Sequence, residues 1–314
     1  MAVLTPKEGA RALPSAAPRR RVLLISRDDE LDSLLVRRRI AAHLGDLSTA
    51  GMCADAGPPD VALVCDDTAA ADRLLEKGVA VVQLRSGQGH PGAEGPRPPE
   101  HSAFRAHREI RVHRPGWLPG PWPQDDGRPT GAVAPVRSAR NRVRSGTLLL
   151  MSLWGVPDEQ TAAFTAGPLQ ALVREAVRRT GHCTVVCDTR LTMVRRALDG
   201  RHDDAVRAVR AAEADVDALH ASSEAFLSSP TLTALTLAHA RRSPLALLPP
   251  LGDAQRDLAG RVARVVPLPS ADGPGAWAAH VGDGPWAALD PALDDLRGAQ
   301  RVARTLRQLS LAPR

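Results

Sequence analysis

The segment Phe226–Thr233 holds the residues best suited to binding chemistry, because an apolar run ends there in two serines and a proline. Pro230 suits the first position of a helix, and Ser229 can cap that helix. The free N–H groups at a helix N-terminus, here those of Thr231 and Leu232, suit a phosphate, as does the Ser229 hydroxyl. The segment therefore predicts a diphosphate site, and a capped helix without a ligand is the alternative.

A base is the second requirement, because transfer of a group to a hydroxyl needs a carboxylate or an imidazole to take the proton. His90 lies in a loop after the third apolar run, and an imidazole titrates near neutral pH. Asp28 and Asp29 follow the first run, and Asp66 and Asp67 follow the second. Ligands of parallel sheets bind at such strand ends. We predict His90 and Asp28 as catalytic candidates, with solvation of His90 and helix capping by Asp28 as the alternatives.

Two other motifs carry weaker signals. Gly87–Gly92 matches the glycine pattern of dinucleotide-binding proteins, but Pro91 stands inside it and more prolines follow, so we expect a loop. His182–Cys187 holds a histidine and two cysteines at a spacing unlike that of zinc knuckles, and these residues suit a buried strand. The P-loop Gly-Lys-Ser/Thr motif is absent. We predict neither a metal site nor a cofactor.

The charge balance of 41 basic and 35 acidic residues gives a net charge of +6. Only Lys7 and Lys77 are lysines, and the sequence has 27 prolines and no tyrosine, a composition typical of GC-rich actinobacterial genomes. Nucleic-acid binding would favour stacking aromatic side chains, which make up only 3% of the chain. Four cysteines are too few for a disulfide scaffold. We therefore predict reduced thiols and no nucleic-acid partner.

The length of 314 residues, 43% of them hydrophobic, suffices for two domain cores. Residues 1–20 lack periodicity and are expected to form a disordered tail. No apolar run approaches the roughly 18 residues that a membrane-spanning helix needs. The short run Val22–Ile25 after Arg19–Arg21 does not form the core of a signal peptide. We expect a cytoplasmic protein without a membrane span.

Short apolar runs alternate with helical patterns along the chain, which is typical of parallel sheets covered on both faces. We predict two Rossmann-like parallel-sheet α/β domains that face a cleft, with the C-terminal helix crossing back. The expected domains are an N-terminal acceptor-side domain at 21–135, a linker at 136–146 and a ligand-binding domain at 147–314. Strands are expected at 22–26, 61–65, 79–84, 109–113, 147–153, 183–187, 224–228 and 244–248. Helices are expected after Asp28 or Asp29 and at 68–77, 157–179, 192–222, 230–242, 253–260 and 291–309.

The segment Phe226–Gln255 (FLSSPTLTALTLAHARRSPLALLPPLGDAQ) resembles the donor half of GT-B glycosyltransferases, in which a strand, a Ser-Pro turn, a helix and a strand ending in Pro-Pro hold a nucleotide sugar. Leu150–Val156 (LMSLWGV) looks like the strand and Gly turn that open the donor domain. The resemblance is greatest to proteins related to cytosylglucuronic acid (CGA) synthase, the glycosyltransferase-like enzymes of nucleoside-antibiotic pathways. It covers residues 147–268, and the N-terminal half only in its strand-helix alternation.

The resemblance implies transfer of a sugar from a nucleotide donor, with uridine diphosphate (UDP) as the expected nucleotide, to a small acceptor. The donor is a substrate, and no metal ion takes part. The implied donor-site residues form three groups: phosphate contacts, sugar contacts and the wall of the cleft. They are Ser229, Thr231 and Thr233 for the phosphates, Gln255 and Asp253 for the sugar, and Trp154 and Gly155 for the wall.

Departures from the GT-B pattern favour a second interpretation. Thr231 stands where these enzymes have a glycine, and Leu237 stands where an acidic residue holds the ribose hydroxyls. An apolar side chain cannot accept those hydrogen bonds. The loop Ser26–Asp29 after the first strand contains no glycine. The alternative is a catalytically degenerate GT-B protein that binds a metabolite or a protein partner.

Overall fold

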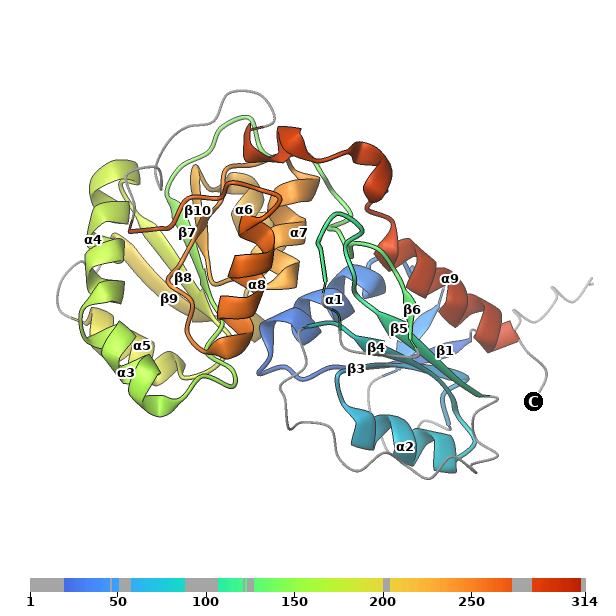
Figure 1. Ribbon diagram of the computed structural model, residues 1–314. Helices are drawn as coiled ribbons and strands as arrows, with labels where there is room; N and C mark the ends of the chain where they lie inside the picture. Colours follow the sequence, from blue (N-terminus) through green and yellow to red (C-terminus); the bar gives the residue numbers. More distant parts are fainter. Residues whose placement is uncertain are drawn as a thin grey trace, which may run out of the picture.

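The computed structural model describes residues 20–45, 47–50, 58–87, 107–120, 122, 127–199, 204–272 and 284–311. Two parallel sheets lie side by side, and each is covered by helices (Figure 1). The first sheet has the strand order β2-β1-β3-β4-β5-β6 and the second has the order β11-β10-β7-β8-β9. The strands of the first sheet are β1 (Arg21–Ile25), β2 (Ser48–Ala50), β3 (Val61–Cys65), β4 (Ala80–Arg85), β5 (Arg108–Val112) and β6 (Arg128–Pro129). Those of the second are β7 (Thr147–Met151), β8 (Cys183–Cys187), β9 (Val206–Arg210), β10 (Ala225–Ser228) and β11 (Ala246–Leu247).

The helices follow the strands in the α/β alternation that the sequence predicts. In the first half these are α1 (Leu31–Ala41) and α2 (Thr68–Glu76). In the second half they are α3 (Asp158–Ala166), α4 (Pro168–Thr180), α5 (Leu191–Leu198), α6 (Val216–Ser222), α7 (Leu232–Ala240), α8 (Asp253–Ala263) and α9 (Gly298–Leu311), with 3-10 turns at η2 (Ala211–Glu213), η3 (Gly284–Ala288) and η4 (Pro291–Leu293). The predicted fold class, two Rossmann-like parallel-sheet α/β domains, is confirmed.

The central strands are apolar at most positions because helices cover both faces of each sheet. All five residues of β3 and all five of β7 are buried. On α4 the buried side chains of Leu169, Leu172, Val173 and Ala176 recur at helical spacing and pack against the second sheet. The pattern of apolar residues therefore decides which face of α4 turns inward.

The chain crosses back to the first domain before α9, as predicted, and α9 packs against the first sheet (Figure 1). Val302, Ala303 and Leu306 of α9 share a buried core with Val22 of β1 and Leu63 of β3. The end of the chain therefore ties the two halves together.

Helix α1 is the main contact between the domains, and eight of its eleven residues are buried. Val36 and Ile40 pack into the first domain. Leu31, Leu34 and Leu35 belong to the core cluster of the second domain, which includes residues of α7 and α8.

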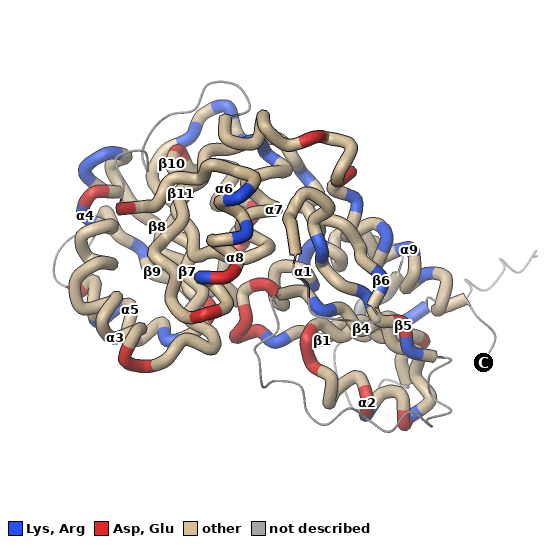
Figure 2. Tube along the Cα trace, viewed as in Figure 1, with Lys and Arg blue, Asp and Glu red and all other residues tan. Residues whose placement is uncertain are grey.

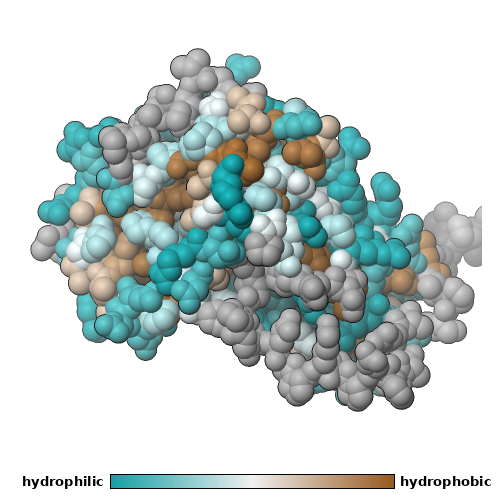
Figure 3. Space-filling model, viewed as in Figure 1, coloured by the Kyte–Doolittle hydropathy of each residue, from teal (hydrophilic) through white to brown (hydrophobic). Residues whose placement is uncertain are grey.

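On the face seen in Figure 3, hydrophobic side chains gather over the second domain and hydrophilic ones cover the outer margins.

Several element predictions were wrong in detail. The helix expected at 157–179 is interrupted at Gly167 and forms α3 and α4. The helical region expected at 192–222 contains β9, an edge strand in which only Arg207 and Arg210 are exposed. The short strands β2 and β6 were not predicted. The helix expected at 291–309 consists of the 3-10 turn η4 and then α9.

Helix caps also differ from expectation. Glu30, and not Asp28 or Asp29, is the N-cap residue of α1, and its side chain makes no capping hydrogen bond. Helix α7 begins at Leu232, two residues after Pro230, so its N-cap is Thr231 and not Ser229. The Thr231 hydroxyl accepts a hydrogen bond from the Ala234 N–H at 3.3 Å.

Candidate functional site

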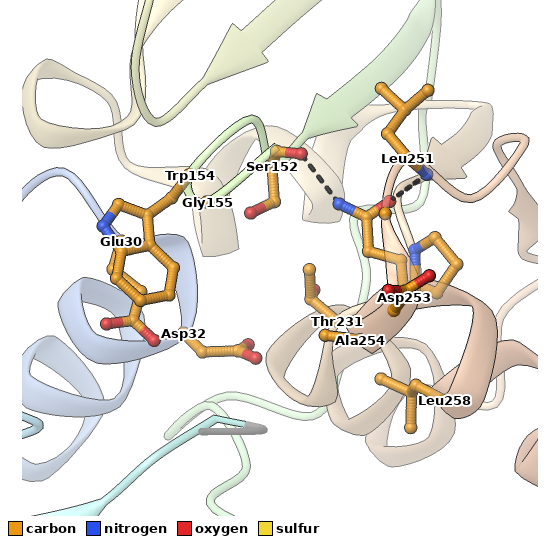
Figure 4. A pocket seen from close by; sticks show the side chains of 13 residues that line it. Glu30, Asp32, Ser152, Trp154, Gly155, Thr231, Leu251, Asp253, Ala254 and Leu258 are labelled. Carbon is orange, nitrogen blue, oxygen red and sulfur yellow. Dashed lines mark hydrogen bonds between the residues drawn. The ribbon is translucent and has the colours of Figure 1, made fainter. Parts of the chain in front are cut away.

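A pocket lies between the two domains where the carboxyl ends of their strands face each other. In the second sheet the chain runs from β7 to β8 and β9 on one side, and β10 and β11 lie on the other. Such a change of direction leaves a crevice at the strand ends, where parallel sheets bind ligands. The pocket is lined by residues that follow β1, β7, β10 and β11 (Figure 4): Glu30, Asp32, Ser152, Trp154, Gly155, Pro230, Thr231, Leu251, Gly252, Asp253, Ala254, Gln255 and Leu258.

Asp32 of α1 reaches across the domain interface to the start of α7. Its carboxylate accepts hydrogen bonds from the N–H of Leu232 at 3.2 Å and from the N–H of Thr233 at 2.8 Å. The Thr233 hydroxyl also donates to it. Burial raises the pKa of Asp32 to about 6, although the hydrogen bonds from Thr233 and Leu232 favour the charged form. The first turn of α7 therefore holds an anionic group that belongs to the other domain.

Glu30 is the second carboxylate in the pocket wall, and only 8% of the residue is exposed. Its Oε2 atom has no hydrogen-bond partner among the described residues, although the Arg27 guanidinium lies 3.7 Å away. Burial, followed by the charges of Asp66 and Asp32, raises the pKa of Glu30 to about 9. Glu30 is therefore protonated near neutral pH.

Two further buried carboxylates stand at the same strand ends and brace the loops. Asp66, which follows β3 with a positive φ of 61°, accepts hydrogen bonds from the N–H of Ser86 at 2.8 Å and from the Ser86 hydroxyl. Asp188, which follows β8, accepts from the N–H of Leu153 at 2.8 Å and from the Ser152 hydroxyl at 2.7 Å. Burial raises the pKa of both aspartates. Figure 2 shows acidic positions at the start of α1, where the first domain faces the second.

The turn after β7 forms another wall of the pocket. Gly155 has a positive φ of 68°, which a glycine adopts without strain. This turn presents Trp154, whose ring lies 5.5 Å from the Arg27 guanidinium of the first domain. A cation over an aromatic face is a favourable contact. Arg27 and Trp154 therefore form a second contact across the domain interface, and both Trp154 and Gly155 line the pocket.

The three residues predicted to contact phosphates occupy different environments. Thr231 lines the pocket and caps α7. Thr233 is fully buried and bonded to Asp32. The Ser229 hydroxyl is also buried and accepts a hydrogen bond from the N–H of Ser152 at 3.1 Å. Only Thr231 therefore faces the pocket directly.

The two residues predicted to face the sugar both line the pocket, with different contacts. Gln255 is buried, and its amide bridges two backbone segments (Figure 4): it donates to the Ser152 carbonyl at 2.9 Å and accepts from the Leu251 N–H at 2.9 Å. Asp253 is the first residue of α8, its side chain is 93% exposed, and it pairs with Arg256 at 2.5 Å. Gln255 therefore braces the pocket, whereas Asp253 lies open to solvent.

Of the predicted catalytic residues, the structure places only Asp28, because His90 lies outside the described residues. Asp28 is exposed, accepts a hydrogen bond from the Ser26 hydroxyl at 2.7 Å, and lies 3.5 Å from the Arg37 guanidinium. It does not line the pocket. Glu30 and Asp32 were not predicted, although the rule that singled out Asp28, a carboxylate after the first strand, applies to them equally.

Leu237 has no access to a ligand. Its side chain is fully buried in the core that α1 and α7 share. In the described part of the chain, no group of three His, Cys, Asp or Glu side chains is arranged to hold a metal ion. Cys183 and Cys187 of β8 are buried free thiols. Among the described residues, no helix is long and apolar enough to span a bilayer.

Three solved glycosyltransferase structures can be superimposed on nearly the whole chain at low identity. The spinosyn rhamnosyltransferase SpnG is 17% identical with a TM-score of 0.44, over 93% of this chain and 96% of that one. The glycosyltransferase SnogD from Streptomyces nogalater is 15% identical with a TM-score of 0.43, over 93% and 95%. A UDP-glucosyltransferase from Polygonum tinctorium is 13% identical with a TM-score of 0.41, over 94% of both chains.

No curated protein sequence matches the chain. A family model, in contrast, matches residues 22–314, which include both domains and the pocket between them. The match confirms the resemblance seen in the sequence and extends it to the N-terminal half. The chain belongs to the CGA synthase-related protein family.

Proposed function

We propose that the pocket between the two domains binds a nucleotide sugar, with UDP as the expected nucleotide, and that the sugar passes to a small acceptor. The observation that carries this proposal is a set of three hydrogen-bond donors at the start of α7, which all bond to the Asp32 carboxylate. Phosphate oxygens accept the same kind of hydrogen bond, and the positive end of the helix dipole favours them. Membership of the CGA synthase-related family supports the same function.

In the proposed complex the donor diphosphate lies at the start of α7. The N–H groups of Leu232 and Thr233 and the hydroxyls of Thr231 and Thr233 hold it, with Ser229 supporting the turn behind them. Trp154 and Gly155 line the cleft beside the donor, and Asp253 and Gln255 lie at the sugar. Negative charge develops on the departing diphosphate, so donors aimed at it stabilise the transition state.

Glu30 is the proposed base, since it is a carboxylate that faces the pocket from the acceptor-side domain. Because the pKa of Glu30 is about 9, we expect transfer to be fastest at alkaline pH, where the ionised carboxylate takes the proton of the acceptor hydroxyl. The acceptor oxygen then bonds to the anomeric carbon, the bond from that carbon to the diphosphate breaks, and its electron pair stays on the diphosphate. His90 remains a second candidate base, and Asp28 is less well placed because it is exposed and lies beside Arg37.

A second candidate is a degenerate GT-B protein that binds a metabolite or a protein partner without catalysis. Two observations favour it. Leu237 is core, so the ribose has no acidic partner at that position. In addition, the hydrogen-bond donors at the start of α7 are already bonded to Asp32. For both candidates we expect a cytoplasmic protein without a nucleic-acid partner.

Calorimetric titration with UDP and UDP-glucuronic acid distinguishes the two candidates. We expect Thr231→Val to weaken UDP binding, because it removes a hydroxyl that lines the pocket. Thr236→Val is the matched control, since Thr236 is a buried threonine of the same helix whose hydroxyl lies 3.4 Å from His113. Equal loss in both variants would contradict the assigned position. If UDP binds neither the wild-type protein nor Asp32→Ala, in which the anion site is open, the second candidate, a protein without transferase activity, would be favoured.

A further inference from the structure

We infer that Asp32 is an intramolecular stand-in for the donor phosphate, so the pocket accepts a phosphate only when Asp32 withdraws from α7. This inference rests on the proposed function, because it assigns the phosphate site to the start of α7. It goes further in naming the residue that determines when that site is open. Asp32 lies 200 residues before Leu232 in the sequence and belongs to the facing domain.

The geometry makes Asp32 and a phosphate mutually exclusive. One carboxylate oxygen accepts from Leu232 and the other accepts from the N–H and hydroxyl of Thr233, so both oxygens are engaged with α7. Only 8% of Asp32 is exposed, which leaves little room for a second anion at these donors. A phosphate placed there would also lie close to a carboxylate, and like charges at such a distance repel each other.

Other contacts keep α1 against the second domain when Asp32 is absent. Arg38 donates to the carbonyls of Ala211 at 2.9 Å and Ala214 at 2.6 Å. The Arg39 side chain is almost fully buried and pairs with Asp217 of α6. The leucines of α1 also remain in the shared core. Removal of the Asp32 carboxylate therefore opens the anion site without dismantling the interface.

Asp32 lines the pocket, so the N–H groups of Leu232 and Thr233 become accessible to a ligand when its carboxylate is removed. Asp32 and Thr231 both line the pocket, so a truncated side chain leaves a space that a ligand can enter (Figure 4). The N–H groups of Leu232 and Thr233 would then be satisfied by water until a phosphate arrives. In the free protein Asp32 occupies the anion site at the start of α7, and in the complex the nucleotide sugar occupies it. Binding of the nucleotide sugar is therefore coupled to the contact between the domains.

The test compares wild-type protein with Asp32→Ala, titrated with UDP and with inorganic pyrophosphate by calorimetry. We expect Asp32→Ala to bind both ligands more tightly, by about tenfold or more, a common size for coupling between sites. Asp32→Asn, which removes the charge and keeps one acceptor oxygen, should lie between the two. Asp215→Ala is the matched control, because Asp215 is a carboxylate that caps α6 within its own domain, where it accepts from the Ala218 N–H at 2.9 Å.

Amide hydrogen exchange gives a readout that does not depend on affinity. The amides of Leu232 and Thr233 should exchange faster in Asp32→Ala than in wild type, and pyrophosphate should slow them again. Circular dichroism confirms that each variant remains folded.

The outcomes distinguish failure of the inference from failure of the proposed function. Tighter binding of pyrophosphate without UDP binding would support Asp32 as the stand-in and overturn the nucleotide-sugar function. Equal UDP binding by wild type and Asp32→Ala would overturn the inference and leave the function intact. Failure of Asp32→Ala to bind either ligand would overturn both.

Discussion

The Arg39 guanidinium of α1 forms a bidentate ion pair with the Asp217 carboxylate of α6 across the domain interface. Its Nη2 lies 2.8 Å from Oδ1 and its Nε lies 3.1 Å from Oδ2. The same guanidinium donates to the carbonyl of Val133 at 3.0 Å and to that of Thr233 at 3.2 Å. Arg39 therefore holds α6, α7 and the chain segment between the sheets in one network. This network is part of the packing between α1 and the second domain.

Loss of the Asp217 charge should destabilise the protein. We expect Asp217→Asn to lower the free energy of unfolding by about 1–3 kcal/mol, because a buried charge that loses its partner is costly and Asp217 itself is partly exposed. Urea denaturation measures the change. Asp158→Asn is the control, since Asp158 pairs with Arg190 but its side chain is 91% exposed. A loss of the same size in both variants would contradict a special role for the interface pair.

Glu30 should make the stability of the fold fall as the pH rises. Its pKa is about 9 in the folded protein against an ordinary value of 4.5, so the folded state binds more protons than the unfolded state between these values. The contribution of Glu30 to stability is therefore complete below pH 4.5 and is lost as the pH rises to about 9. Asp66, Asp32 and Asp188 add negative charge around Glu30, and Arg27 opposes them.

Thermal unfolding between pH 5 and 9.5 measures this dependence. Glu30→Gln should flatten the decline, because the amide does not ionise. Glu76→Gln, a change of the same kind at an exposed position of α2, should leave the decline unchanged. The same pH dependence in Glu30→Gln and wild type would show that Glu30 is not held in its protonated form.

The bridging amide of Gln255 should contribute to stability as well as to any contact with a ligand. We expect Gln255→Leu to lower the free energy of unfolding by about 1–3 kcal/mol, since the Ser152 carbonyl and the Leu251 N–H lose their partner. Asp253→Asn, at an exposed position of the same helix, should change it by less than about 0.5 kcal/mol. If Gln255→Leu unfolds like the wild type in urea, the bridge contributes nothing to the fold.

Leu237 should behave as a core residue and not as a degenerate ligand contact. Leu237→Ala should cost about 2–5 kcal/mol, as is usual for a fully buried leucine. Leu237→Glu, which restores the acidic type found in GT-B donor helices, should prevent folding because it buries an unpaired charge. Circular dichroism and urea denaturation report both effects. A folded Leu237→Glu protein with gained affinity for UDP would show that this position faces the donor.

The alternation of apolar runs and helical patterns by itself determined the fold class. Strands such as Val61–Cys65 and Cys183–Cys187 are apolar at most positions, and only a sheet covered on both faces accounts for them. The Ser-Pro segment before α7 and the turn at Trp154 and Gly155 likewise indicated the two strand ends that border the pocket. These features are local, so the sequence alone reveals them.

Tertiary structure decided which side chains meet in the pocket. Asp28, Glu30 and Asp32 lie within five residues, and nothing in their types distinguishes them. The starting point of α1 turns Glu30 and Asp32 toward the second domain and leaves Asp28 in solvent. The pairing of Asp32 with Thr233 spans 201 residues, so it depends on how two separate sheets dock. Local patterns carry no information about that docking, because it is set by the packing of α1 against α7.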